Sequence, residues 1–241
     1  MVFSSIAFLY FFLPVLLILY FAVPGKFKNT VLFTFSILFY FYGEPLYTVL
    51  LLFSSVSGYV HGRLIERFKG TAFSKVFLVS SILFGLGALG FFKYSDFFIE
   101  NVNALFESDI RMLGLVLPLG ISFYTFQILS YTIDVYRGDV SVQKNALDFL
   151  MYVALFPQLI AGPIVRYAQI ESEIKDRIHN FENLYEGIRL FLFGLGKKVL
   201  LANTLAEVGT HFENANETSV LFHWLMAIAF TLQIYYDFSG Y

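Results

Sequence analysis

The sequence predicts an all-α fold, a multi-pass bundle of transmembrane helices in which some helices are kinked or re-entrant. Hydrophobic residues make up 58% of the chain and charged residues only 14%, against roughly 25% charged in soluble domains. Residues 1–25, 112–133 and 218–236 contain no Asp, Glu, Lys or Arg. Uncharged apolar runs of about 18 residues or more are the usual signal of a membrane span.

Eight spans or partial spans are expected along the chain. In order, they cover Ser5–Val23, Thr30–Tyr42, Leu46–Val60, Lys75–Phe92, Leu113–Asp134, Phe149–Val165, Leu184–Leu205 and Ser219–Tyr236. The first lacks the basic start and the cleavage site of a signal peptide, so we expect it to be retained. The second and third are short, and Gly43-Glu44-Pro45 between them predicts a tight hairpin or a partly re-entrant helix.

The basic residues between the spans predict the orientation. With the N-terminus outside the cytoplasm, the inner loops carry most of the lysines and arginines, among them Arg63, Arg67 and Lys69. The outer loops over the same stretch carry only Lys93 and Arg111. This bias follows the positive-inside rule, so we expect an extracytoplasmic N-terminus. The mixed-charge region 166–186 is then a cytoplasmic amphipathic segment of a single membrane domain over residues 1–241.

Composition and spacing exclude several classes of site. The chain has no cysteine, which removes disulfides, thiolate zinc sites and a cysteine nucleophile. No basic cluster indicates nucleic acid, and the four histidines lack metal-ligand spacing, so we expect no metal. Residues 85–90 spell a dinucleotide-binding fingerprint, but inside an apolar span these glycines indicate close helix packing. Gly58 and Gly62, which are four residues apart, likewise indicate that two helices pack closely.

Polar residues recur at helical spacing inside one apolar span. Tyr124, Gln127, Tyr131 and Asp134 are three, four and three residues apart, which places them on one helix face. Such groups are costly in hydrocarbon unless they face protein or water. The spacing therefore predicts an inward stripe that lines a polar cavity. Hydrogen bonding between helices, without any chemistry, is the alternative for each residue.

The last span repeats this pattern with Gln233, Tyr236, Asp237 and Gly240 on one face. Two inward stripes would suffice to line a polar funnel through the bundle. As before, packing alone remains the alternative for any one of these residues.

The segment Phe156–Tyr167 carries two prolines and a glycine in a short apolar run, which breaks a regular helix. We expect a re-entrant or kinked segment beside the polar chamber, with Gln158 in the funnel and Arg166 at its inner mouth. A simple proline-kinked span is the alternative. Lys197 and Lys198 interrupt a later apolar stretch and are expected to reach the inner surface or anionic head groups.

Taken together and in this order, the motifs resemble the membrane-bound O-acyltransferase (MBOAT) family, in particular its alginate O-acetyltransferase branch. The resemblance covers nearly the whole chain. It is carried by Met1–Ser5, Tyr42–Pro45, Pro118–Phe123, Tyr131–Gly138, Phe156–Arg166, Gly196–Val199 and Leu232–Tyr241.

The resemblance implies a ring of helices around a funnel in the bacterial inner membrane. An acyl group from a cytoplasmic thioester, acetyl-CoA or a carrier thioester, would pass to an extracytoplasmic polysaccharide such as alginate. The implied partners are an accessory extracytoplasmic acetyltransferase and polysaccharide synthesis proteins, with no resident cofactor. The family's catalytic histidine has no matching position before Tyr241. We therefore expect this chain to be an N-terminal half that is inactive alone.

Two other classes of function remain open from the residues. Inward Asp and Gln stripes with broken helices also suit a transporter or channel. A non-catalytic scaffold of an envelope-synthesis complex is the third possibility.

Overall fold

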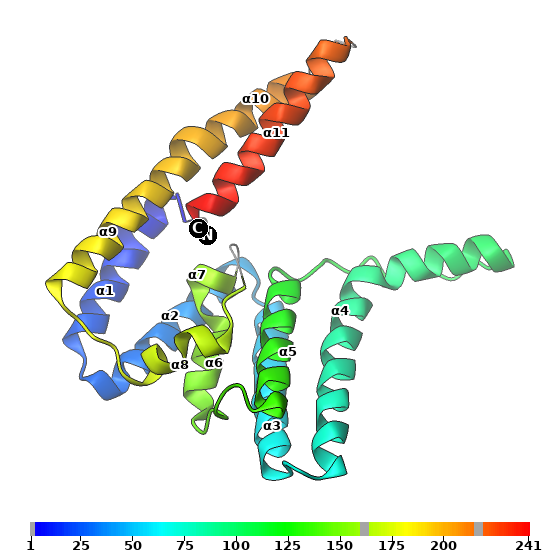
Figure 1. The fold of residues 1–241 in the computed structure, drawn as a ribbon. Coiled ribbons are helices and arrows are strands. Elements are labelled where there is room, and N and C mark those ends of the chain that lie inside the picture. Colours follow the sequence, from blue (N-terminus) through cyan, green and yellow to red (C-terminus); the bar gives the residue numbers. More distant parts are fainter. Residues whose placement is uncertain (1–2, 160–163, 215–218) are drawn as a thin grey trace. The chain divides into compact units, whose positions relative to one another are not determined.

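The computed structural model describes residues 3–159, 164–214 and 219–241, and over these ranges the chain is helical with no strand (Figure 1). The prediction of an all-α fold is confirmed. The α-helices are α1 Leu13–Ala22, α2 Lys28–Gly43, α3 Tyr47–Arg67, α4 Ala72–Phe106, α5 Ile121–Arg137, α6 Ala146–Ala154, α7 Phe156–Leu159, α8 Tyr167–Lys175, α9 Phe181–Gly196, α10 Asn203–Asn214 and α11 Val220–Gly240. Phe8–Phe12 and Lys197–Ala202 form π-helical segments, and Gly25–Phe27 is a short 3₁₀ turn.

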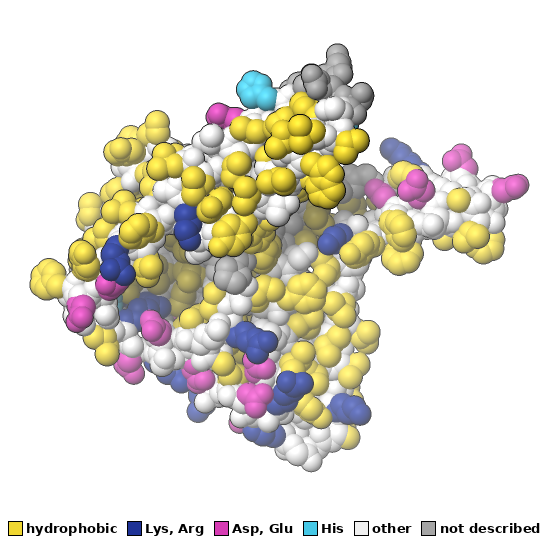
Figure 2. Space-filling model, turned by 45° about the horizontal axis from the view of Figure 1, so that its top comes forward, with side chains coloured by type: hydrophobic (Ala, Val, Ile, Leu, Met, Phe, Trp, Pro, Cys, Tyr) yellow, Lys and Arg dark blue, Asp and Glu magenta, His cyan; other side chains and the backbone are white. Residues whose placement is uncertain are grey.

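Two of these helices, α3 and α4, are long and apolar enough to cross a membrane, and Phe8–Ala22 is a shorter apolar helix. Figure 2 shows large apolar side chains spread over the face in view. Soluble monomers rarely expose contiguous apolar surface on this scale. Helices suited to crossing a bilayer are therefore present, and the number of eight spans stays a prediction.

The chain divides into two compact units. One contains residues 15–160 and 164–176 and is called here the α2–α8 unit; the other contains residues 1–14, 161–163 and 177–241 and is called the α9–α11 unit.

Small residues allow α3 and α5 to approach closely in the α2–α8 unit. A Cβ atom at Gly62 would lie 2.7 Å from Cε1 of Tyr131, and one at Gly58 would overlap the side chain of Ile128. Both glycines are therefore required by packing, as the sequence predicted. On α4, Gly85 lies against Thr125 and Leu129, whereas a Cβ at Gly87 or Gly90 would meet open space. The packing role predicted for the 85–90 glycines thus holds for Gly85 alone.

Polar side chains tie α2 to α6 and α8. The Asn29 amide donates to the Asp148 carboxylate (2.7 Å) and to the carbonyl of Ile174 (3.1 Å). The Ser36 hydroxyl donates to the carbonyl of Leu32 and accepts from the amide N–H of Phe156 (3.2 Å). These bonds hold the ends of three short helices against α2.

The predicted span Leu113–Asp134 is wrong at its start, because residues 111–118 are not helical and α5 begins only at Ile121. The backbone amides of Leu113 and Gly114 donate instead to the carboxylate of Asp96 (2.7 and 2.9 Å). Gly114 and Gly120 have positive φ (62° and 73°), which a continuous helix cannot contain. Composition alone hides this, because the segment is as apolar as a span.

Other boundaries also differ from the prediction. The helix α4 extends well past the expected end at Phe92, and α3 continues to Arg67 rather than ending at Val60. The turn between α2 and α3 is tight, as expected from Gly43-Glu44-Pro45, since α2 ends at Gly43 and α3 begins at Tyr47.

The predicted break in the Phe156–Tyr167 segment is confirmed where the structure describes it. Helix α6 ends at Ala154, α7 lasts four residues, and a new helix begins at Tyr167. Residues 160–163 lie outside the described residues. Whether the segment re-enters the membrane stays a prediction.

In the α9–α11 unit, α9, the π-helical segment Lys197–Ala202 and α10 follow one another without a break, and α11 packs along them (Figure 1). Two glycines allow the backbones to approach closely, since a Cβ at Gly194 would overlap the carbonyl oxygen of Gly240.

Candidate functional site

The polar stripe predicted on α5 is buried. The side chains of Tyr124, Gln127 and Tyr131 are 1%, 3% and 0% exposed, and Asp134 is half-buried at the end of the same face. The glycines at both ends of α5, Gly120 and Gly138, have positive φ and set where this helix begins and ends.

Two side-chain amides of the predicted set meet at one backbone carbonyl. The Gln127 amide donates to the carbonyl of Tyr152 (3.1 Å), and the Gln158 amide donates to the same oxygen. In a continuous helix this carbonyl would accept from the N–H of Phe156, which instead donates to Ser36. The next residue is Pro157, which has no N–H. The break after α6 therefore frees a carbonyl that two glutamines satisfy.

Four buried aromatic rings surround this point. Tyr131, Phe149, Tyr152 and Tyr167 are each 0% exposed, and successive ring centroids lie 4.6 to 6.0 Å apart. Offset and edge-to-face pairs at such distances add to the energy of burial. The cluster holds α5, α6 and α8 in one arrangement.

The phenol groups of this cluster also have polar partners. The Tyr131 hydroxyl accepts from the backbone N–H of Gln143 (3.0 Å), and the Gln143 amide donates to the Tyr167 hydroxyl (3.2 Å). The Tyr152 hydroxyl donates to the carbonyl of Val165 (3.0 Å). Burial raises the pKa of Tyr167 well above its usual range, so this phenol is neutral at physiological pH.

Arg166 lies outside this buried cluster. Its side chain is exposed, and its backbone N–H donates to Oε1 of Gln169 at the start of α8 (3.0 Å). A place at the mouth of a funnel stays a prediction.

Among the described residues, the Tyr124 hydroxyl has no hydrogen-bond partner, although its oxygen is buried. The neighbouring phenol of Tyr40 donates instead to the carbonyl of Leu119 (2.7 Å). A buried hydroxyl without a partner costs free energy. It therefore remains available to bind something else.

The second predicted stripe lies on the less exposed face of α11. Gln233, Tyr236 and Asp237 are each half-buried, whereas their neighbours Ile234 and Tyr235 are exposed. Asp237 pairs with Lys198, and Lys197 donates to the carbonyl of Ser239 (3.2 Å). Because the two stripes belong to different compact units, a single passage lined by both stays a prediction.

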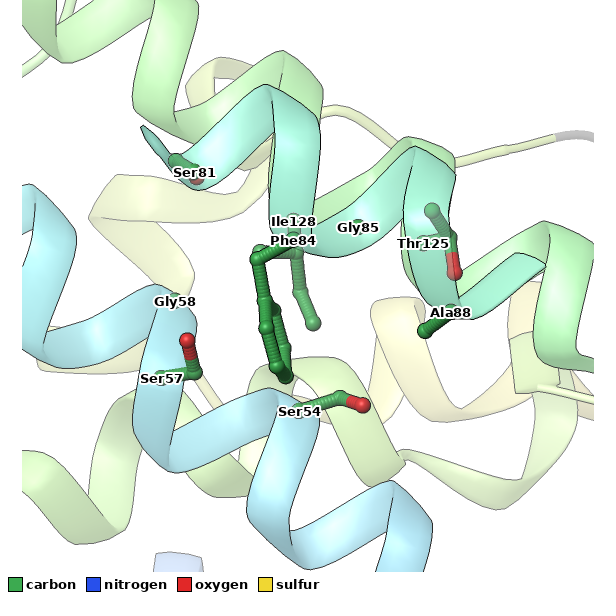
Figure 3. Close-up of a pocket in the computed structure, with 9 residues that line it drawn as sticks. All are labelled: Ser54, Ser57, Gly58, Ser81, Phe84, Gly85, Ala88, Thr125 and Ile128. Carbon is green, nitrogen blue, oxygen red and sulfur yellow. The ribbon is translucent and has the colours of Figure 1, made fainter. Parts of the chain in front are cut away.

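A small cavity lies between α3, α4 and α5 (Figure 3). The hydroxyl-bearing residues Ser54, Ser57, Ser81 and Thr125 line it beside the ring of Phe84. Its volume of about 10 Å³ is close to the space that one water molecule needs. It is too small to hold an acyl donor.

Sequence reasoning missed several polar residues of this unit. Asn29, Ser36 and His61 make long-range bonds, the last to Ser80 on α4 (3.0 Å). Ser36 is a polar residue within an apolar stretch, a signal that could have marked it, whereas Asn29 lies between Lys28 and Thr30 and has no such signal. Over the described residues, no group of three or more His, Cys, Asp or Glu could hold a metal ion.

Comparison with known proteins found relatives over the whole chain. It is 37% identical to the probable alginate O-acetylase of Azotobacter vinelandii, with all of this chain and 49% of that protein aligned. It is 32% identical to the peptidoglycan O-acetyltransferase of Helicobacter pylori, again with all of this chain and 52% of the relative. A weaker match, 24% identical over 53% of the chain and 33% of the relative, is the teichoic acid D-alanyltransferase of Bacillus subtilis.

The chain thus spans about half the length of the curated relatives it matches over its whole length. No family model matches it, and no solved structure matches it significantly.

Proposed function

We propose that this chain, which is related over its whole length to the alginate O-acetyltransferase branch of the membrane-bound O-acyltransferases, is part of an enzyme that transfers an acyl group to a polysaccharide. The shared reaction of its relatives carries the proposal. Alginate O-acetylase and peptidoglycan O-acetyltransferase are named for different acceptors but the same acetyl transfer. The transferred group is therefore the better-supported half of the reaction.

In this scheme the acetyl group comes from acetyl-CoA or a carrier thioester on the cytoplasmic side. It crosses the bacterial inner membrane and reaches an extracytoplasmic polysaccharide such as alginate. The N-terminus of this chain lies on that extracytoplasmic side in the scheme. The buried Tyr124 hydroxyl, which has no partner among the described residues, supports such a route. An acetyl group is neutral and small, so a hydrogen-bond donor can hold it without the cost of burying a charge.

The residues of this chain would position the acyl group rather than perform the chemistry. The general base toward the acceptor hydroxyl would come from a segment outside this chain. Within it, the unpartnered hydroxyl of Tyr124 is the best-placed donor to an acyl oxygen. An accessory extracytoplasmic acetyltransferase and the polysaccharide synthesis proteins complete the proposed assembly.

The test compares a strain lacking the gene with strains that carry the full-length gene product and its operon partners. The measurement is the O-acetyl content of the secreted polysaccharide. We expect acetylation to disappear on deletion and to return with the wild-type gene. If acetylation is unchanged while polysaccharide is no longer exported, the transporter class replaces this proposal. If a stably inserted variant that lacks the chemically active residues restores acetylation as well as the wild type does, a scaffold replaces it.

A further inference from the structure

The C-terminal part of α4 leaves the packed helices. Up to Phe92 the helix is held in the α2–α8 unit: Ser81 and Leu89 are buried, and the Phe92 ring packs edge-on against Tyr47 (5.8 Å). Figure 1 shows the remaining turns pointing away from α5. Residues 93–106 are called the α4 arm here.

Most side chains of the α4 arm are sorted onto two opposite faces; the exception is Asn101 on the apolar side, whose side-chain amide donates to the carbonyl of Phe97 (2.7 Å). Tyr94, Phe98, Val102 and Leu105 are spaced four, four and three residues apart and share one face, on which all four are exposed. The opposite face carries, at the same kind of spacing, Lys93, Asp96, Glu100 and Asn103. Figure 2 shows this projecting segment with apolar atoms along one side and charged atoms along the other.

The polar face is already occupied by the chain that follows it. The Asp96 carboxylate accepts from the N–H groups of Leu113 and Gly114. The Asn103 amide accepts from the Ile110 N–H (2.9 Å) and donates to the Ile110 carbonyl (2.8 Å). These bonds fix the loop on one side of the α4 arm, so the apolar side is the one left uncovered.

The position of the α4 arm along α4 indicates what covers this side. At 1.5 Å per residue, the turns from Ala72 to Phe92 are about 30 Å long, the thickness of a hydrocarbon core. The α4 arm therefore begins where a span through the bilayer would end. A helix that has one apolar and one charged face at that depth is suited to lie in the membrane plane.

The charges of this region exclude attraction to anionic lipids. Between residues 93 and 111 there are two cations, Lys93 and Arg111, and four anions, at 96, 100, 107 and 109. Interfacial helices that bind anionic lipids through charge carry more lysine and arginine than aspartate and glutamate. Any attachment of this helix must come from its apolar face.

We propose that the α4 arm is an interfacial helix, lying on the bilayer surface with Tyr94, Phe98 and Leu105 at the boundary of headgroups and acyl chains and with Glu100 facing water. The lipid surface is then what covers the apolar face of the α4 arm. The proposal requires α4 to be inserted in a membrane and does not depend on the acyl-transfer reaction.

Residues 1–241 contain no cysteine, so a direct test needs only that any cysteine elsewhere in the full-length protein is first replaced by serine. Single substitutions Phe98→Cys, Leu105→Cys and Glu100→Cys in the full-length protein carry an environment-sensitive fluorophore, in nanodiscs of phosphatidylcholine that hold one copy each. Leu83→Cys is the matched control, because Leu83 is exposed on α4 about midway along the proposed span.

We expect labels at 98 and 105 to be quenched about twofold more by lipids with a nitroxide near the headgroup than by lipids with one at the chain end. The label at 83 should show the reverse preference, and the label at 100 should be quenched mainly by aqueous iodide. Replacing half of the lipid by phosphatidylglycerol should change none of these values.

Three results would overturn the proposal. Equal iodide quenching at 98, 105 and 100 would place the whole α4 arm in water. Protection of 98 and 105 from both iodide and lipid nitroxides would show that protein covers the apolar face. A loss of headgroup-depth quenching in anionic lipid would show that charge controls the attachment. Two independent reporter positions keep the test valid if one labelled variant does not fold.

Discussion

Lys198 and Asp237 form an ion pair with 2.6 Å between Nζ and Oδ1, and it joins the π-helical segment to α11. The two side chains are 22% and 31% exposed, intermediate between a surface pair and a buried one. The predicted funnel residue Asp237 is thus held by Lys198, for which the sequence predicted a place at the inner surface or at anionic head groups.

Breaking this pair should destabilise the α9–α11 unit. Asp237→Asn leaves Lys198 unpaired, and we expect a loss of about 1–2 kcal/mol, between the values for exposed and buried pairs. The measurement is thermal unfolding of the detergent-solubilised protein. The control is Arg189→Gln, which removes an exposed pair with Glu186 in the same unit and should cost less than about 0.5 kcal/mol. The exchange Lys198→Asp with Asp237→Lys should recover part of the loss; equal effects of Asp237→Asn and the control would contradict the assignment.

Gly62→Ala should be strongly destabilising because the added methyl group would meet the ring of Tyr131 at 2.7 Å. Overpacking of this kind costs about 1–3 kcal/mol. The matched control is Gly90→Ala in α4, where a Cβ meets nothing within 4 Å and alanine favours the helix by about 0.5–1 kcal/mol. Thermal unfolding should therefore move in opposite directions for the two variants. A Gly62→Ala protein as stable as the wild type would show that α3 and α5 are not in close contact.

The two amides on the Tyr152 carbonyl should be coupled. Gln127→Leu or Gln158→Leu leaves one donor in place, so each single variant should cost about 0.5 kcal/mol. The double variant leaves a carbonyl in the protein interior without these donors and should cost about 2 kcal/mol, more than the sum. A double-mutant cycle on unfolding free energies measures the difference. Strict additivity would mean that the two glutamines act independently.

Tyr124→Phe separates a structural role from a functional one. The hydroxyl has no partner in the part of the chain that the structure describes, so its removal should leave stability unchanged or raise it by up to about 1 kcal/mol. If the hydroxyl binds the acyl group, O-acetylation of the polysaccharide should fall in the same variant. Tyr40→Phe is the comparison, because it removes a hydroxyl that donates to the Leu119 carbonyl and should lower stability. A destabilised Tyr124→Phe protein would show that this hydroxyl has a structural partner.

The orientation is open to a labelling test on intact cells. Lys69→Cys, in the turn between α3 and α4, should be shielded from a membrane-impermeant maleimide, and Asp109→Cys, after α4, should react. Opening the inner membrane should make the first position reactive. The reverse pattern would invert the predicted topology.

Much of the α5 arrangement followed from the sequence, because a helix repeats its faces at fixed spacing. Polar groups in an apolar helix must also face protein or water rather than lipid. Tyr124, Gln127 and Tyr131 are buried together for that reason. The break after α6 was equally visible in Pro157, since proline removes a donor wherever it stands.

What the sequence concealed depends on contacts between distant residues. The freed carbonyl of Tyr152 accepts a hydrogen bond from Gln127 on another helix. The Ser36 hydroxyl accepts from the N–H of Phe156, which lies 120 residues away in the sequence. The Asp96 carboxylate likewise accepts from the N–H groups of Leu113 and Gly114. These bonds keep an apolar segment out of the helix that the segment's composition predicts. No local pattern reports such pairings.

The π-helical segment Lys197–Ala202 takes up one residue more than a regular helix would. A π turn holds one more residue than an α turn, and each residue of an α-helix rotates the next by about 100°. Deleting one residue here would therefore regularise the helix and leave the faces of α9 and α10 nearly in their present relative phase. The same deletion in a regular turn of α10 would rotate all later residues by about 100° and turn their packed face away from α11, so this segment is where the helix can lose a residue at least cost.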